Sequence, residues 1–91
     1  MRRLLSTRRH VPLDRLDEYA AAWLATRDAV AAAGGRAWLF RGAGHDDRFM
    51  EFVEWDSAAG EPLDSAEVRS AIARLGTFAP AADASEWEEA T

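Results

Sequence analysis

The feature that most constrains the fold of this chain is the order in which strand-like and helical sequence periods alternate along its 91 residues. Residues 2–11 suit a strand, and Pro12 closes that segment. A helical period follows to residue 31, and two strand-like segments then occupy residues 36–41 and 49–55. A second helical period and a last strand candidate at residues 85–89 complete the chain. The sequence therefore predicts the order β-α-β-β-α-β.

The first helix is predicted from residues that recur three and four positions apart, with Tyr19 beside the stripe: Leu13, Leu16, Ala20, Trp23, Leu24, Arg27, Val30 and Ala31. Asp14 is the expected N-cap, and Gly34-Gly35 is the expected stop, because glycine tolerates the left-handed conformation that ends helices. In the second helix, Asp64 and Glu67 form a capping pattern, Val68, Ile72 and Leu75 form the apolar stripe, and Gly76 and Pro80 end it.

The element order predicts one α+β domain over residues 1–91, a ferredoxin-like βαββαβ sandwich in which two helices cover one face of a four-stranded antiparallel sheet. In this topology the first strand is central and the last lies beside it. Charge supports this pairing. Arg2, Arg3, Arg8 and Arg9 lie on the first strand, whereas Glu86, Glu88 and Glu89 lie near the C-terminus.

Both faces of the middle strands carry apolar bulk. Trp38 and Phe40 alternate with Ala37 and Leu39, and Phe49, Val53 and Trp55 alternate with Met50 and Phe52. The helices account for one face, and a water-facing sheet surface is normally polar at alternate positions. We therefore expect a homodimer in which the second face packs on that of a second copy, as a closed, barrel-like pair.

Composition excludes several kinds of chemistry. The chain has no cysteine, its basic side chains are all arginine, and it has two histidines. Thiolate metal sites, disulfides and Schiff-base lysines are excluded, and we expect no metal and no cofactor. The net charge of −5 argues against nucleic-acid binding. The apolar runs are too short for a membrane span or a signal peptide, so we expect no membrane partner and a cytoplasmic protein.

The run Phe52-Val53-Glu54-Trp55-Asp56-Ser57-Ala58 ends the third predicted strand with an aromatic, an acidic and a small residue. With the Pro12–Tyr19 helix entry and the Gly34-Gly35 exit, it resembles the dimeric α+β barrel superfamily, in particular the small antibiotic-biosynthesis-monooxygenase-like proteins. The resemblance implies a dimeric barrel that serves cofactor-independent oxygenation, isomerisation or haem degradation. Haem degradation is not expected here, because the asparagine of its first strand is replaced by Ser6 or Thr7 and its helical histidine is absent.

The candidate catalytic residues are Glu51, which stands among apolar residues, and His10, at the end of the first strand. The candidate ligand-binding residues are Trp55, Trp38, Arg9 and Arg41, since arginine forks suit anionic groups. Each has a structural alternative. The tryptophans could be core residues, and Glu51 could form an ion pair with an arginine of the first strand. His45, beside Asp46 and Asp47, could bind a metal weakly, but the turn interpretation is favoured.

Two functions remain open. The first is a barrel that binds a small hydrophobic or anionic molecule between sheet and helices, as a cofactor-independent monooxygenase or an isomerase; a ligand-sized cavity that holds Trp55 and Glu51 would support it. The alternative is a non-catalytic dimerisation or regulatory module. RNA binding, which the element order also allows, is discounted because the third predicted strand is acidic and has no glycine.

Overall fold

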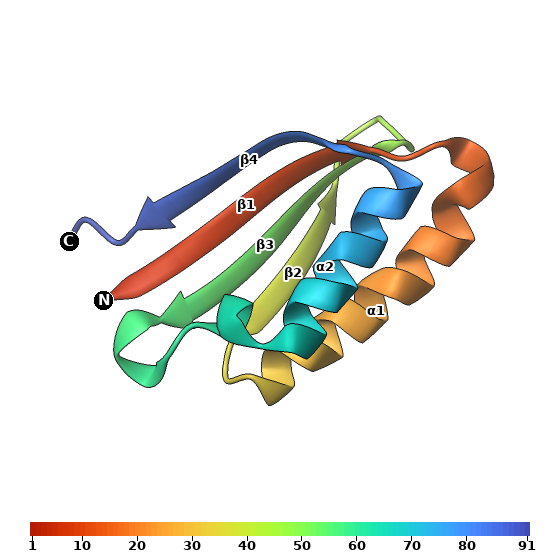
Figure 1. Ribbon diagram of the computed structural model, residues 1–91. Helices are drawn as coiled ribbons and strands as arrows, with labels where there is room; N and C mark the ends of the chain where they lie inside the picture. Colours follow the sequence, from red (N-terminus) through yellow and green to blue (C-terminus); the bar gives the residue numbers. More distant parts are fainter.

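A computed structural model describes residues 1–91, and it confirms the predicted α+β fold. The strands are β1 (Arg2–His10), β2 (Arg36–Arg41), β3 (Arg48–Asp56) and β4 (Ala81–Glu88). They form one antiparallel sheet in the order β2-β3-β1-β4, so the first strand is central and the last lies beside it, as expected (Figure 1). β4 begins at Ala81, several residues before the predicted candidate at residues 85–89. The sequence pattern missed this start because the first half of β4 is poor in strand-forming side chains.

The helices are α1 (Leu16–Ala32) and α2 (Ala66–Phe78), and each follows a short 3-10 turn. Their ends differ from the prediction in three respects. Asp14 lies in the preceding turn and does not cap α1, while the cap of α2 is Ser65, whose hydroxyl accepts a hydrogen bond from the backbone of Val68. Gly76 lies inside α2, which continues to Phe78 because that side chain packs in the core. Gly34, with φ of 88°, follows the end of α1 as predicted.

The buried stripe of α1 is rotated from the predicted one, and consists of Tyr19, Ala22, Trp23, Thr26 and Val30. Leu24 is 49% exposed. Alanines lie on both sides of this helix, so apolar spacing alone could not fix which face is buried. The tertiary contacts of the large Tyr19 and Trp23 rings decide it.

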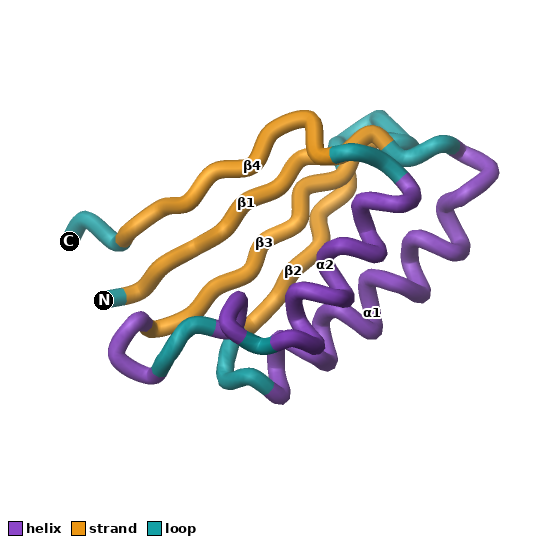
Figure 2. The backbone as a smooth tube through the Cα atoms, viewed as in Figure 1, coloured by secondary structure: helices purple, strands orange, loops and turns teal.

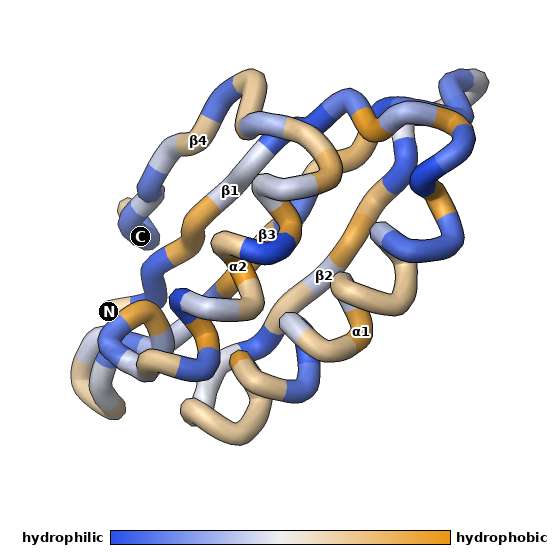
Figure 3. Tube along the Cα trace, turned by 45° about the vertical axis from the view of Figure 1, so that its right-hand side comes forward, coloured by the Kyte–Doolittle hydropathy of each residue, from blue (hydrophilic) through white to orange (hydrophobic).

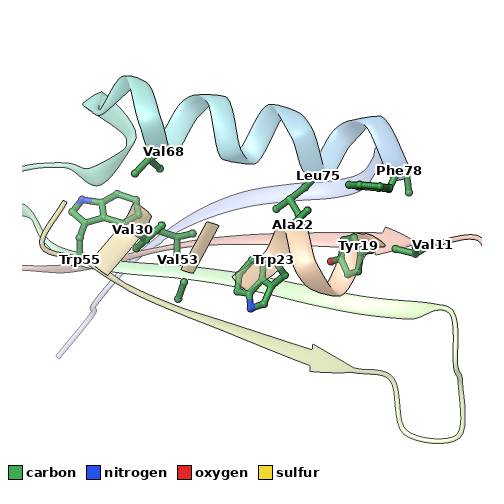
Figure 4. Close-up of a cluster of buried hydrophobic side chains, with 12 residues drawn as sticks. Val11, Tyr19, Ala22, Trp23, Val30, Val53, Trp55, Val68, Leu75 and Phe78 are labelled. Carbon is green, nitrogen blue, oxygen red and sulfur yellow. The ribbon is translucent and has the colours of Figure 1, made fainter. Parts of the chain in front are cut away.

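Both helices lie on one side of the sheet and leave the other side without a covering layer (Figures 1 and 2). Core side chains of α2, including Val68, Leu75 and Phe78, face the layer that holds Val53 and Trp55 of β3 (Figure 4). The side chains of β1 and β3 alternate across the sheet, so Glu51, Val53 and Trp55 face the helices while Met50, Phe52 and Glu54 face away. We call the side that faces away from the helices the open face.

The expected charge pairing between β1 and the C-terminal segment is present. Arg2 forms an ion pair with Glu89 at 2.7 Å, and Arg3 lies 3.4 Å from Glu88 and 3.7 Å from Glu86. These pairs are solvent-exposed, so each contributes little stability by itself, roughly 0–1 kcal/mol. Their main consequence is to favour the register in which β4 lies beside β1.

Candidate functional site

The open face of the sheet carries a cluster of large apolar side chains from all four strands. We call Leu4, Trp38, Phe40, Phe52 and Trp87 the aromatic cluster. Strand register brings them together, since Trp38 pairs with Phe52 across β2 and β3, and Leu4 pairs with Trp87 across β1 and β4. The rings of Phe40 and Phe52 meet edge to face at 5.6 Å. The cluster is therefore one continuous apolar surface.

A hollow of about 480 Å³ lies over this cluster. Three of its rings remain open to solvent, with Trp38 39%, Phe40 58% and Trp87 56% exposed. The Trp87 indole N–H donates a hydrogen bond of 2.8 Å to the Ser6 hydroxyl, which holds that ring across β1. A hollow of this size, with apolar walls and few polar groups, is in the range of small-molecule sites.

Charged side chains border the hollow at one end of the sheet: Arg2, Arg3, Glu54, Glu88 and Glu89. Arg2 also forms an ion pair with Glu54 at 3.2 Å. The Glu54 side chain is only 17% exposed, against 60% for Glu88 and 40% for Glu89. Glu54 is therefore the most shielded of these three carboxylates, and Arg2 neutralises it.

A second polar group lies on the opposite side of the sheet, under the helices. Glu51 of β3 accepts hydrogen bonds on one carboxylate oxygen from Arg9 Nε at 2.8 Å and from the Tyr19 hydroxyl at 2.6 Å. Arg9 also donates from a terminal guanidinium nitrogen to the carbonyl oxygen of Ala79 at 2.8 Å. The arginine and the carboxylate are 4% and 5% exposed. We call Arg9, Tyr19 and Glu51 the buried triad.

The buried triad satisfies its own charges. Burial raises the pKa of Tyr19 far above its ordinary value, and the hydrogen bond to Glu51 raises it further, so this hydroxyl stays protonated as a donor. The carboxylate is balanced by the Arg9 guanidinium, which is the ion pair with a first-strand arginine that the sequence left open. These contacts tie β1, β3, α1 and the end of α2 together. The arrangement is that of a structural network between layers.

The structure separates the residues that the sequence singled out. Trp38 lines the hollow on the open face, whereas Trp55 is 4% exposed in the core under the helices. Arg9 lies in the buried triad, and Arg41 is exposed at the end of β2. His10 is exposed at the end of β1. The layer between sheet and helices, where we expected a small molecule, holds a cluster of twelve buried hydrophobic side chains, with Glu51 and Trp55 both buried in the same layer.

Sequence reasoning did not place Trp87 or Glu54 at a site. Trp87 was part of a weak strand candidate, and only its pairing with Leu4 brings it onto the aromatic cluster. Glu54 alternates with Glu51 along β3 but faces the other way, and strand alternation from Phe52 could have indicated this. His45 lies in the exposed β2–β3 turn, and no three histidine, aspartate or glutamate side chains gather as a metal would require. Neither helix has the length and apolar composition needed to cross a membrane.

Searches against family models and curated proteins find no match to this chain. Several solved structures share its fold. SnoaB of Streptomyces nogalater, described as a cofactor-independent oxygenase, is similar with a TM-score of 0.80 at 16% identity, over 99% of this chain and 94% of that one. An antibiotic biosynthesis monooxygenase-like protein of Bordetella bronchiseptica gives 0.74 at 15%, over 99% and 98%. A possible oxidoreductase of Bacteroides thetaiotaomicron gives 0.80 at 13%, over 97% of each chain. The resemblance read from the sequence is thus confirmed at the level of fold.

Proposed function

We propose that this chain forms a homodimer through the open face of its sheet and binds a small hydrophobic molecule over the aromatic cluster. The observation that carries the proposal is the concentration of exposed Trp38, Phe40 and Trp87 around a hollow of about 480 Å³. A contiguous apolar surface of this kind marks a site of association or ligand binding on a soluble domain. A ring-lined hollow favours a flat, apolar ligand, because aromatic rings stack and pack edge to face.

The dimensions of the open face support a second copy as its partner. Four strands of up to nine residues outline a face of roughly 19 by 30 Å. Two such faces would bury roughly 1,100 Å² in total, close to the lower end of stable, specific interfaces. A twofold pair presents the same patch from both sides, so the aromatic cluster of each protomer meets its equivalent.

We assign the ligand to the open face rather than to the layer between sheet and helices, because core side chains fill that layer. Pairing of two protomers would close the hollow from above, and water exclusion would strengthen polar contacts inside it. Glu54 is the group we assign to proton transfer if the bound molecule reacts. SnoaB has the same fold and is described as a cofactor-independent oxygenase, so oxygenation of a flat, apolar substrate is the first reaction class to test.

Sedimentation equilibrium at micromolar protein tests the dimer, with Phe40→Glu as the disrupting variant. The wild type should have twice the 10.0 kDa chain mass, and Phe40→Glu should shift the protein toward the monomer, since it buries a charge in an apolar interface. Leu24→Glu is the matched control, because Leu24 is 49% exposed on α1, outside the open face. A monomeric wild type, or equal behaviour of both variants, would refute the interface.

Isothermal titration of the wild type with naphthalene tests the ligand site. Binding that Trp38→Ala weakens and Leu24→Ala leaves unchanged would support a site over the aromatic cluster. A stable dimer that binds no apolar probe would instead favour the non-catalytic dimerisation module, in which the partner's side chains fill the hollow.

A further inference from the structure

The charged residues that line the hollow over the aromatic cluster are three glutamates and two arginines, so its lining carries an excess of one negative charge. Each arginine is shared between two carboxylates. Arg2 pairs with Glu89 at 2.7 Å and with Glu54 at 3.2 Å. Arg3 lies 3.4 Å from Glu88 and 3.7 Å from a further glutamate outside the hollow. The guanidinium groups of the lining are therefore fully engaged, and the carboxylates are not fully balanced.

Charge and apolar surface meet at this end of the sheet, where the start of β1 is hydrophilic and the residues that follow are hydrophobic (Figure 3). Glu54 stands at this boundary. It follows Phe52 on the open face of β3 and lies opposite Leu4 of β1 in the strand register, next to two members of the aromatic cluster. Its ion pair with Arg2 involves one carboxylate oxygen, and no hydrogen bond or ion pair involves the other. This second oxygen is a free acceptor for a donor group of a ligand.

Arg36 of β2 does not fill this place. It lies opposite Glu54 in the register of β2 and β3 but forms no ion pair with it. Arg36 lines a neighbouring hollow of about 300 Å³ and not the larger one. The arginines that the sequence suggested for an anionic ligand lie elsewhere as well, since neither Arg9 nor Arg41 lines the larger hollow. No unpaired guanidinium group is therefore available there to bind an anion.

The aromatic walls of the hollow also suit a positive charge. The face of a tryptophan or phenylalanine ring attracts a cation that lies within roughly 6 Å of the ring centre, and tryptophan attracts it most strongly. Trp38 and Trp87 both line the hollow. Trp87 already donates its indole N–H to Ser6, so this ring can offer a ligand its face but no further donor. The net charge of −5 on the chain favours the approach of cations over anions.

We propose that the hollow over the aromatic cluster binds a hydrophobic organic cation, in which an ammonium group is attached to a flat apolar body. This inference rests on the ligand site proposed above and names the class of molecule that the site takes. The ammonium group would donate to the free oxygen of Glu54, and the apolar body would pack on the aromatic rings. Closure by a second copy of the chain would exclude water and strengthen the attraction between the two charges.

The test is isothermal titration of the full chain at pH 7 with three probes that share one ring system: 1-naphthylmethylamine, 1-naphthalenemethanol and 1-naphthoate. The amine is charged at this pH, because alkylammonium groups titrate near ~10. It should bind at least about tenfold more tightly than the alcohol, and the carboxylate should bind more weakly than the alcohol. Added sodium chloride should weaken binding of the amine and leave binding of the alcohol unchanged.

Glu54→Gln should weaken binding of the amine by about tenfold and change binding of the alcohol by less than about twofold, because it removes the charge but keeps an acceptor oxygen. Glu61→Gln is the matched control. It removes the same charge from an exposed residue outside the hollow, so it should change neither affinity.

The cation inference is overturned if the alcohol and naphthalene bind but the amine binds no more tightly, or if Glu54→Gln binds the amine as tightly as the wild type does. The ligand site would still stand in either case. Failure of naphthalene and all three probes to bind would instead refute the ligand site itself, and the cation inference with it.

Discussion

Replacing Arg9 with methionine tests whether the buried triad holds the two layers together. The substitution keeps a long apolar side chain and removes both donors, to Glu51 at 2.8 Å and to the Ala79 carbonyl at 2.8 Å. The Glu51 carboxylate would remain 5% exposed, with the Tyr19 hydroxyl as its remaining side-chain donor. An unneutralised charge is then left in the core.

The expected loss in the free energy of unfolding comes from the buried Glu51 carboxylate that the substitution leaves without its arginine. Removing one partner of a buried ion pair costs about 3–5 kcal/mol, because the other charge stays desolvated. For a domain of this size each kcal/mol lowers Tm by roughly 4–8 °C, so Arg9→Met should lower Tm by at least about 12 °C. The double variant Arg9→Met/Glu51→Leu should be more stable than Arg9→Met alone, since it removes the orphaned charge as well.

Urea denaturation, followed by circular dichroism, measures these losses in the free energy of unfolding. All variants are compared at one fixed protein concentration, since association would change the apparent stability. Arg74→Met is the control, and as a surface substitution it should change stability by about 0.5 kcal/mol or less. A loss below about 1 kcal/mol for Arg9→Met, or a double variant less stable than the single one, would show that the buried triad does not hold the two layers together.

Three further outcomes follow from single contacts. Tyr19 is the only tyrosine, and because its pKa is raised, phenolate absorbance should appear only when alkali unfolds the protein. The contribution of Tyr19 to the free energy of unfolding is complete below the ordinary tyrosine pKa of about 10 and is lost as the pH rises above it. Tyr19→Phe should remove this loss of stability at high pH. Ser65→Ala removes the cap of α2 and should lower the free energy of unfolding by about 0.5–2 kcal/mol in urea. Gly35→Ala should cost about 1–3 kcal/mol in the same assay, because its Cβ would lie 2.8 Å from Pro62 and 2.9 Å from Val30; an unchanged midpoint would contradict that crowding.

The strand order, the two-layer architecture and the pairing of β1 with the C-terminal segment could be predicted from the sequence. Alternation of Trp38 and Phe40 with Ala37 and Leu39 separates the two faces, and opposite charges identify neighbouring strands. Strand alternation is a local pattern, and the opposite charges of neighbouring strands can be read from the residue types alone. The helix caps were less accessible, because Asp64 and Ser65 are adjacent and both suit a cap, and only the hydrogen bond from Val68 distinguishes them.

The candidate sites depend on contacts between residues distant in sequence. Glu51 and Arg9 are 42 positions apart, and no local pattern shows that they meet under the helices with Tyr19. Likewise, Trp87 joins the aromatic cluster through a register of β1 and β4 that spans most of the chain. A residue's face could be predicted from alternation, but its partners on that face could not.

The central proposal for this protein is that a second copy of the chain covers the open face. An isotope-filtered NOE experiment on dimers that mix labelled and unlabelled protein detects contacts between protomers alone. A dimer formed through the open face should give cross-protomer contacts among the Trp38, Phe52 and Trp87 side chains. Contacts that instead involve Leu24 or other exposed residues of α1, or the absence of any cross-protomer contact, would contradict it.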